Sequence, residues 1–249
     1  MTYQNEISVI DCAKCPLRAK ECFSPFKAEE LAFMQRFKTG EMVADTGTQL
    51  FIEGARAAQL FTVLSGMGIR YKTLEDGSRQ VISFVMPGDF IGLQAGVMDE
   101  MCHSVEASTP MRLCVFNRNR VFELFQSQPE RAFALTHIAA VEEHFLGDAL
   151  TTVGQRGALE KIGWSLHRFF RRARALGLTT DNSCPLPFRQ QDLADALGLS
   201  LVHTNKTLAK LRESGTASWS HGVLKIMDED ALTKLSQIDP DSVQTRPLI

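Results

Sequence analysis

Short runs of β-branched and aromatic residues, separated by glycine turns, fill the stretch from Thr39 to Phe116. The runs include FTVLSG, GIRYKTL, RQVISFV and RLCVF, and the turns include Ser65-Gly66, Asp76-Gly77 and Pro87-Gly88-Asp89. Strands at nearly regular spacing with glycine turns predict an antiparallel sandwich or β-roll. This pattern places a β-domain in the first half of the 249-residue chain.

The periodicity becomes helical after Arg118 and stays helical to Thr152, with Pro129 placed where a new helix could begin. One apolar stripe recurs at helical spacing, formed by Ala134, Ile138, Val141, Phe145 and Thr152. This stripe packs either against its own domain or against a second copy of the chain. A homodimer seam is at least as well supported, because the β-roll already has its own core.

The strongest local signal is RQQDLADALGLSLVHTNKTLAKLRESG, which runs from Arg189 to Gly215. It predicts a helix-turn-helix, with the small Ala194 where the helices cross, Gly198 at the chain reversal and Ser200 as the N-cap of the second helix. The following ASWSHGVLKI predicts a two-stranded wing that turns at His221-Gly222. The alternative is an ordinary αα-hairpin. The wing and the basic surroundings favour the DNA-binding helix-turn-helix over this alternative.

The second helix of this motif is expected to present a polar outer face. Its inner face is predicted from its apolar spacing and consists of Leu201, Thr204, Leu208 and Leu211. Asparagine and lysine side chains can hydrogen-bond base edges in the major groove, and histidine or lysine can hold phosphates. The candidate DNA-binding residues are therefore Ser200, Val202, His203, Asn205, Lys206 and Lys210.

Charge is distributed unevenly along a chain whose net charge is only −2. The stretch from Gln155 to Lys225 has eleven basic and five acidic residues, whereas residues 1–154 have fourteen and nineteen. This division favours a sensor joined to a nucleic-acid-binding module. The alternative is a solvated helix face, because four of the basic residues fall on one helix, namely Arg168, Arg171, Arg172 and Arg174.

No uncharged run is longer than the thirteen residues from Ala57 to Ile69, whereas a membrane span needs about 20 apolar residues. The first residues, MTYQNEISVIDCAKC, carry acidic side chains and no basic region, so no secretory signal is predicted. We therefore expect a soluble, cytoplasmic protein that makes no contact with a membrane. Its six cysteines are then expected to be reduced thiols or metal ligands.

The order of these parts resembles the CRP/FNR family of bacterial transcription regulators over roughly residues 23–228. LFTVLSGMGIRYKTLEDGSRQVISFVMPGDFIG is similar to the family's β-roll core, and QQDLADALGLSLVHTNKTLAKL is similar to its DNA-binding signature. The resemblance implies an α+β fold with an N-terminal antiparallel β-roll (a cyclic-nucleotide-binding-like jelly roll), a long dimerisation helix and a C-terminal winged helix-turn-helix. It also implies a homodimer that binds a double-stranded DNA operator and works with RNA polymerase.

The expected organisation has five segments: an N-terminal cysteine segment (1–22), a β-roll sensor domain (23–120), a dimerisation helix (121–153), a winged helix-turn-helix domain (154–228) and a disordered tail (239–249).

Two departures from the family pattern are informative. Leu93-Gln94 follows the G-D-F-I-G turn in place of Glu-Leu, and no Lys or Arg occurs between Arg79 and Arg112. A buried cyclic phosphate would lack its cation, so cyclic AMP is not expected.

The second departure lies in the recognition helix, where better-known members carry a Glu and an Arg that read cytosine and guanine. The matching positions are Val202 and Lys206. Since valine cannot accept a hydrogen bond from cytosine, a different operator is expected, with Asn205 as the residue that reads an adenine.

Three cysteines, Cys12, Cys15 and Cys22, lie within eleven residues ahead of the β-roll. They resemble the oxygen-sensing branch of the family, which holds an iron–sulfur cluster with three such cysteines and one on the strand that ends the roll, here Cys114. The resemblance implies a [4Fe–4S] cluster on these four residues. The second gap is six residues here and five in that branch, and related regulators keep CPLR with no cluster. In the alternative, Cys114 is a core residue and Cys22 is incidental.

The sequence therefore predicts a redox- or oxygen-responsive DNA-binding regulator. The alternative is a cluster-free regulator of the same family that responds to a small ligand or to thiol oxidation. Cys102 and Cys184 are expected to have no special role. An enzyme with a cupin-type metal site is not expected, because the six histidines contain no His-x-His pair.

Overall fold

The computed structural model describes residues 9–238 and 245–249, which belong to two compact units. The first, here called the β-roll unit, contains the described residues up to 70 together with 84–138 and 246–249. The second, here called the helical unit, contains residues 71–83 and the described part of 139–245.

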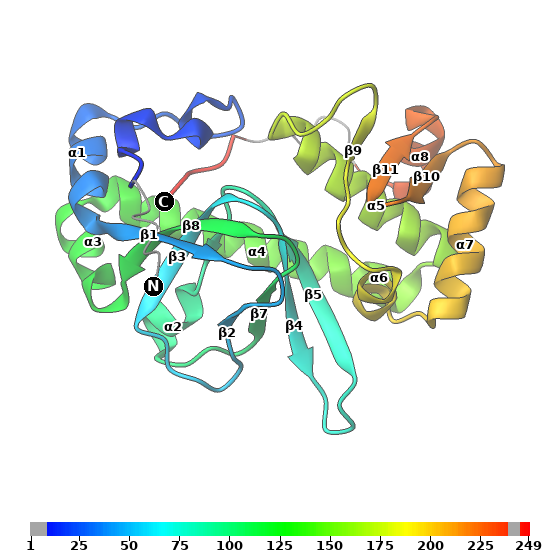
Figure 1. Ribbon diagram of the computed structural model, residues 1–249, viewed down its shortest axis with the longest axis horizontal. Coiled ribbons are helices and arrows are strands. Elements are labelled where there is room, and N and C mark those ends of the chain that lie inside the picture. The colour runs from blue at the N-terminus through cyan, green and yellow to red at the C-terminus, as the bar shows by residue number, and fades with distance from the viewer. Residues whose placement is uncertain (1–8, 239–244) are drawn as a thin grey trace, which may run out of the picture. The chain divides into compact units, whose positions relative to one another are not determined.

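Eight strands form two four-stranded sheets, as the glycine-punctuated pattern predicts (Figure 1). One sheet has the order β1 (Lys38–Ala44), β8 (Met111–Asn117), β3 (Gln59–Ser65) and β6 (Phe90–Ile91). The other has the order β2 (Gln49–Phe51), β7 (Ser104–Ala107), β4 (Gly68–Thr73) and β5 (Arg79–Val85). Both sheets supply buried side chains to one core, including Phe61 and Leu113 from the first and Phe51 and Val105 from the second. The predicted β-roll is confirmed.

The G-D-F-I-G turn needs its glycines for two physical reasons. Gly88 and Gly92 both have positive φ angles, of 84° and 94°, which other residues rarely adopt. A Cβ atom on Gly92 would also lie 2.5 Å from the Cζ atom of Phe51. Asp89 closes the turn by accepting a 2.9 Å hydrogen bond from the Met86 amide, and α2 (Leu93–Met98) follows directly.

The predicted long helix is divided into two. The helix α3 (Val121–Ser127) ends before Gln128, and α4 (Pro129–Gln155) begins at the proline that the sequence marked as a helix start. Proline has no amide hydrogen and disfavours the helical conformation of the residue before it, so the break falls at Gln128. The β-roll unit also contains α1 (Ala28–Phe37) and the short helix η3 (Arg118–Arg120).

The helical unit contains the predicted helix-turn-helix and wing, together with one helix that the sequence analysis did not predict. Its elements are α5 (Ala158–Ala175), β9 (Ser183–Pro185), α6 (Gln190–Leu197), α7 (Leu201–Glu213), β10 (Ala217–Ser220), β11 (Val223–Ile226) and α8 (Glu229–Ser236). Leu235 of α8 packs against Gly163 of α5, and the Ser236 hydroxyl lies 2.7 Å from the Nδ1 atom of His167. The unit therefore continues past residue 228, where the sequence analysis ended it.

The C-terminal segment differs from the expected disordered tail. Residues 239–244 of that predicted tail lie outside the described residues. Residues Arg246–Ile249 instead belong to the β-roll unit, where Arg246 forms a parallel bridge with Phe23 and the side chains of Leu248 and Ile249 are buried. Two apolar side chains and one arginine anchor the segment. Among the described helices, none is long and apolar enough to cross a membrane.

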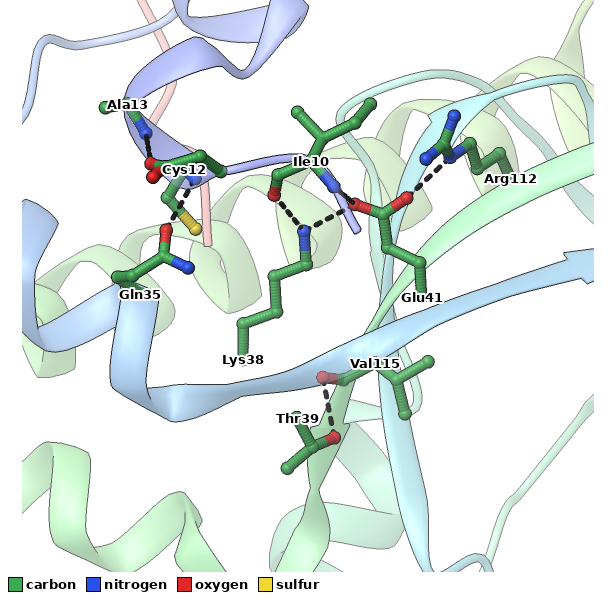
Figure 2. A network of polar contacts seen from close by, with 10 residues as sticks. Ile10, Cys12, Ala13, Gln35, Lys38, Thr39, Glu41, Arg112 and Val115 are labelled. Atoms are coloured by element: carbon green, nitrogen blue, oxygen red, sulfur yellow. Dashed lines mark hydrogen bonds and ion pairs between the residues drawn. The ribbon is translucent and has the colours of Figure 1, made fainter. Parts of the chain in front are cut away.

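A buried ionic network joins the start of the described chain to the β-roll (Figure 2). The Glu41 carboxylate, whose side chain is 0% exposed, accepts hydrogen bonds from the Lys38 ammonium (2.5 Å), the Ile10 amide (2.7 Å) and the Arg112 guanidinium (2.5 Å). Burial alone would raise the pKa of Glu41, but these three donors hold it below its ordinary value. The Lys38 ammonium also donates to the Ile10 carbonyl, at 2.7 Å.

Replacing Glu41 with alanine should lower the free energy of unfolding by about 3–5 kcal/mol, because it leaves the buried Lys38 ammonium without its counter-ion. Urea denaturation followed by circular dichroism measures this loss. The matched control is Glu123→Ala, which breaks the solvent-exposed pair with Arg120 and should cost much less. Equal losses in the two variants would show that the Glu41 network contributes no more than a surface pair.

Candidate DNA-binding surface and cysteine group

The helix-turn-helix is built from local caps that the sequence specifies. The Asp192 carboxylate accepts a 2.9 Å hydrogen bond from the Arg189 amide at the start of α6, and it also pairs with the guanidinium groups of Arg189 and Arg79. Gly198 ends α6 with a φ angle of 62°. The Ser200 hydroxyl caps α7 by accepting a 3.2 Å hydrogen bond from the His203 amide. The predicted turn and N-cap are therefore confirmed.

The inner face of α7 matches the prediction except at one residue. Thr204, Leu208 and Leu211 are buried as expected, but Leu201 is 39% exposed. Leu201 is the first residue of the helix, and its exposure shows that it does not anchor α7. Thr207 is buried although it was not predicted to be. Its hydroxyl donates to the His203 carbonyl at 2.8 Å, so this polar group has a hydrogen-bond partner within α7.

The six candidate DNA-binding side chains share the outer face of α7 and its N-terminus. All of them are exposed, namely Ser200, Val202, His203, Asn205, Lys206 and Lys210. The structure thus places the predicted set on one accessible surface, here called the α7 surface. Exposed asparagine and lysine side chains there can donate to base edges, and the helix N-terminus with Ser200 favours a phosphate.

The wing is held in place by one hairpin turn and one side chain. His221 and Gly222 both have positive φ angles, of 50° and 73°, which fits the two-residue turn predicted from the sequence. The Trp219 indole donates a 3.2 Å hydrogen bond to the Leu186 carbonyl, which fixes β10 against the segment before α6. The wing therefore has a defined position beside α7 within the helical unit.

The basic row on α5 is partly used inside the helical unit. Arg174 forms two hydrogen bonds with the Glu229 carboxylate, at 2.8 and 2.6 Å. Arg168 stacks over the Phe145 ring at 4.4 Å and reaches the Trp164 ring at 5.8 Å. Two of the four arginines thus make contacts inside the unit. For these two, the charge excess is explained by the helix itself and does not indicate contact with nucleic acid. The exposed cations of α7 remain on its surface.

In the β-roll unit, three of the four predicted metal ligands meet around one small cavity. Cys12 and Cys15 belong to the short helix η1 (Cys12–Lys14) and the residue after it, and Cys114 lies on β8, paired with Glu41 of β1. These three residues, here called the cysteine group, line a cavity of about 30 Å³ together with Lys38. Cys22 does not line this cavity.

Burial dominates the chemistry of these thiols. It raises the pKa of Cys114 to about 12, although the nearby Lys38 ammonium acts in the opposite direction. Burial also raises the pKa of Cys12, against the same ammonium, and the pKa of Cys22. The three thiols are therefore protonated near neutral pH, and a reagent or metal that needs a thiolate must first displace a proton.

The space around the cysteine group does not fit a four-iron cluster in this conformation. A cavity of about 30 Å³ has room for only a few water-sized molecules, far less than four irons and four sulfides need. Across the described residues, no group of three or more His, Cys, Asp or Glu side chains is arranged to hold a metal ion. The ligand set of Cys12, Cys15, Cys22 and Cys114 stays a prediction, because a cluster would require the 12–22 segment to move and Cys22 to join the group.

The remaining two cysteines lie apart from the cysteine group. Cys102 is exposed, and Cys184 is buried on β9 in the helical unit, where burial raises its pKa to about 12. The sequence analysis missed Lys38, Glu41 and the segment 246–249. Charged residues inside a strand run such as KTGEMVA give no sign of burial by themselves, because their partners are distant in sequence.

Comparison with known families matches both units. The cyclic nucleotide-binding domain matches residues 41–128, and the Crp-like helix-turn-helix domain matches residues 162–235. The first match covers most of the β-roll strands, and the second runs from α5 into α8.

Curated relatives extend the similarity across most of the chain. The nitrogen fixation regulation protein FixK of Azorhizobium caulinodans is 30% identical over 84% of this chain and 87% of its own length. FixK of Bradyrhizobium diazoefficiens is 29% identical, with coverages of 87% and 90%. The transcriptional activator protein FnrL of Cereibacter sphaeroides is 27% identical, with 82% of each chain covered.

Among solved structures, FixK2 from Bradyrhizobium japonicum superposes with a TM-score of 0.71. It is 23% identical, and the match covers 80% of this chain and 98% of that one, which shows a shared fold. The family consists of transcription regulators rather than enzymes. Both domain matches, the full-length relatives and the exposed recognition helix lead to one conclusion: the chain is a DNA-binding transcription regulator of the CRP/FNR family, in its FixK-like branch.

Proposed function

We propose that this protein is a homodimeric, sequence-specific transcription regulator that responds to oxygen or redox state through its cysteine group. The observation that carries the proposal is the meeting of Cys12, Cys15 and Cys114 around one cavity, although they come from opposite ends of the β-roll sequence. Relatives named as transcriptional activators support activation, which requires a contact with RNA polymerase.

The α7 surface reads the operator. In the major groove, Asn205 and Lys206 reach base edges, while Ser200, His203 and Lys210 hold the phosphates on either side. Val202 contacts a base through its methyl groups, because it has no hydrogen-bonding atom to offer. All six side chains are exposed and accessible to DNA.

The dimer seam lies on α4. Its exposed apolar side chains are Val141, Leu146 and Leu150, and Leu150 is 75% exposed. Three residues of the stripe predicted from the sequence make contacts within the chain and are not part of this seam. Ala134 and Thr152 are buried in their own units, and Phe145 stacks on Trp164.

Two glycines support the same seam. Gly147 and Gly154 lie inside α4, where each costs about 1 kcal/mol relative to alanine, yet a Cβ atom on either would meet nothing within 4 Å. Within the described residues, no neighbouring atom requires these glycines. A second helix that approaches α4 closely would require them.

Cyclic AMP is not the proposed signal, because no Lys or Arg lies between Arg79 and Arg112 to neutralise a buried phosphate. A small ligand of unknown chemistry is the second candidate. A cavity of about 250 Å³ in the β-roll unit favours it, with a lining that mixes apolar residues such as Phe51 and Phe61 with polar ones such as Gln49 and Arg56.

The operator contacts give a prediction with a clear control. On an operator selected from random DNA, Lys206→Ala and Asn205→Ala should each lose about 1–3 kcal/mol of binding, and much less on random DNA. Fluorescence anisotropy at fixed salt measures both affinities. Lys234→Ala removes an exposed cation from α8 and should leave the operator affinity unchanged. Equal losses on both DNAs would assign Lys206 and Asn205 to phosphates.

The seam gives a second prediction. The double variant Leu146→Glu, Leu150→Glu should be monomeric by light scattering and should lose operator binding, because four like charges would meet at a two-fold seam. Val97→Glu places the same charge on an exposed apolar position of α2 and should remain dimeric. A dimeric double variant would place the seam elsewhere.

Purification without oxygen separates the possible signals. If the four-cysteine prediction holds, the protein should contain about four irons per chain and bleach in air. Cys114→Ser should then abolish the brown colour of the iron–sulfur cluster. Cys184→Ser also alters a buried thiol and should leave the colour unchanged. Iron-free protein whose operator affinity changes on thiol oxidation would support the thiol alternative. An operator affinity that responds neither to air nor to thiol oxidation would contradict the redox proposal.

A further inference from the structure

The segment Arg246–Ile249 lies against the N-terminal cysteine segment of the β-roll unit, where the red and blue ends of the chain meet in Figure 1. The backbone of Arg246 makes both hydrogen bonds of a strand pair: its amide donates to the Cys22 carbonyl at 2.9 Å, and its carbonyl accepts from the Ser24 amide at 2.9 Å. This pairing holds Cys22 away from the cavity that the other three cysteines approach.

The Arg246 side chain binds the G-D-F-I-G turn. Its guanidinium forms a 2.8 Å ion pair with Asp89 and donates to the Pro87 carbonyl at 3.0 Å. It also stacks over the Phe23 ring, with 4.9 Å from its central carbon to the ring centre. Because the Asp89 side chain is only 11% exposed, solvent screens this ion pair less than it screens a pair on the surface.

The last two side chains cover the cysteine group. Leu248 and Ile249 are 4% and 5% exposed, and both line the cavity that Cys12, Cys15 and Cys114 share. Arg131 donates to the Leu248 carbonyl at 3.3 Å, and the Thr62 hydroxyl donates to the Ile249 carbonyl. The segment therefore contributes both to the walls of the cavity and to the burial of its thiols.

We propose that residues 246–249 are a latch whose docking on the β-roll unit controls access to the cysteine group. The inference rests on the proposed function in taking these thiols as the sensing groups. While docked, the latch fills the space beside the thiols and pairs with Cys22. Any event that enlarges the cavity or draws Cys22 into the group must displace the latch, and release of the latch must open the cavity. The two equilibria are therefore reciprocally coupled.

The latch also has a route to the DNA-binding module. The chain leaves α8 at Ser236 and re-enters the β-roll unit at Arg246, so the latch is attached to the unit that carries the α7 surface. The covalent connection itself does not change; docking holds its far end on the β-roll unit, and release frees that end. A signal that acts at the thiols can be passed on by this connection without a separate partner.

Thiol labelling of the full-length protein tests the latch. In reduced protein, deletion of residues 246–249 should raise the rate of iodoacetamide labelling at Cys12 and Cys114 by about tenfold or more, as mapped by peptide mass spectrometry. Arg246→Glu should act in the same direction, because it reverses the charge that pairs with Asp89. A synthetic peptide of residues 245–249 should restore protection to the deleted protein.

Three controls make the outcome decisive. Cys184, as buried as Cys114 but in the helical unit, should label at an unchanged slow rate, which shows that the variants remain folded. Cys102 is exposed and should label quickly in every variant. Lys234→Glu makes the same charge reversal on α8 and should leave all rates unchanged. Unchanged labelling of Cys12 and Cys114 in both latch variants, with Cys184 protected, would overturn the proposal.

The labelling result is independent of the regulatory role. Operator affinity of the same variants, measured before and after thiol oxidation, reports on the proposed function alone. Faster labelling with no response of operator affinity to oxidation would support the latch and overturn the redox function. A redox response with no change in labelling would do the reverse.

Discussion

The buried Glu41 carboxylate is the interaction on which the sensing half of this protein depends. It collects three donors from three parts of the chain: the Ile10 amide, the Lys38 ammonium and the Arg112 guanidinium. Because the Ile10 amide is two residues from Cys12, the network fixes the start of the cysteine segment against β1 and β8. Cys114 is the direct cross-strand neighbour of Glu41, so the same pair of strands places the fourth thiol. The Glu41 network and the β1–β8 pairing thus both help to bring these cysteines together.

The same network sets the resting state of the thiols. Lys38 is close enough to favour thiolates at Cys12 and Cys114, yet burial outweighs it and both thiols have raised pKa values. The ammonium is already engaged by Glu41, which weakens its effect on its sulfur neighbours. A group of protonated thiols beside so small a cavity is chemically quiet. Reactivity must then come from a change in access, which is the role that the docked C-terminal segment can fill.

Features that depend on contacts between residues close in sequence were predicted correctly, and features that depend on distant residues were not. The helix-turn-helix depends on Gly198 and Ser200, which act on residues within one turn of themselves, and both were placed correctly. Only Leu201 was wrongly placed on the inner face of α7, because helical spacing alone cannot show where burial begins along a helix. The position of Cys22, the burial of Glu41 and the docking of Arg246 all depend on contacts between residues far apart in the chain. No local pattern carries that information, and spacing treats Cys22 as equivalent to Cys12 and Cys15.

The internal use of the α5 arginines has a consequence for how this regulator responds to ionic strength. Each phosphate neutralised by a cation contributes a slope of about −0.9 to the dependence of log affinity on log salt concentration. Arg174 is already neutralised by Glu229, and Arg168 is stacked on Phe145. Fewer counterions are then released when this module meets DNA than the eleven basic residues between Gln155 and Lys225 suggest. The dependence of DNA affinity on salt concentration should therefore be shallower than that count predicts.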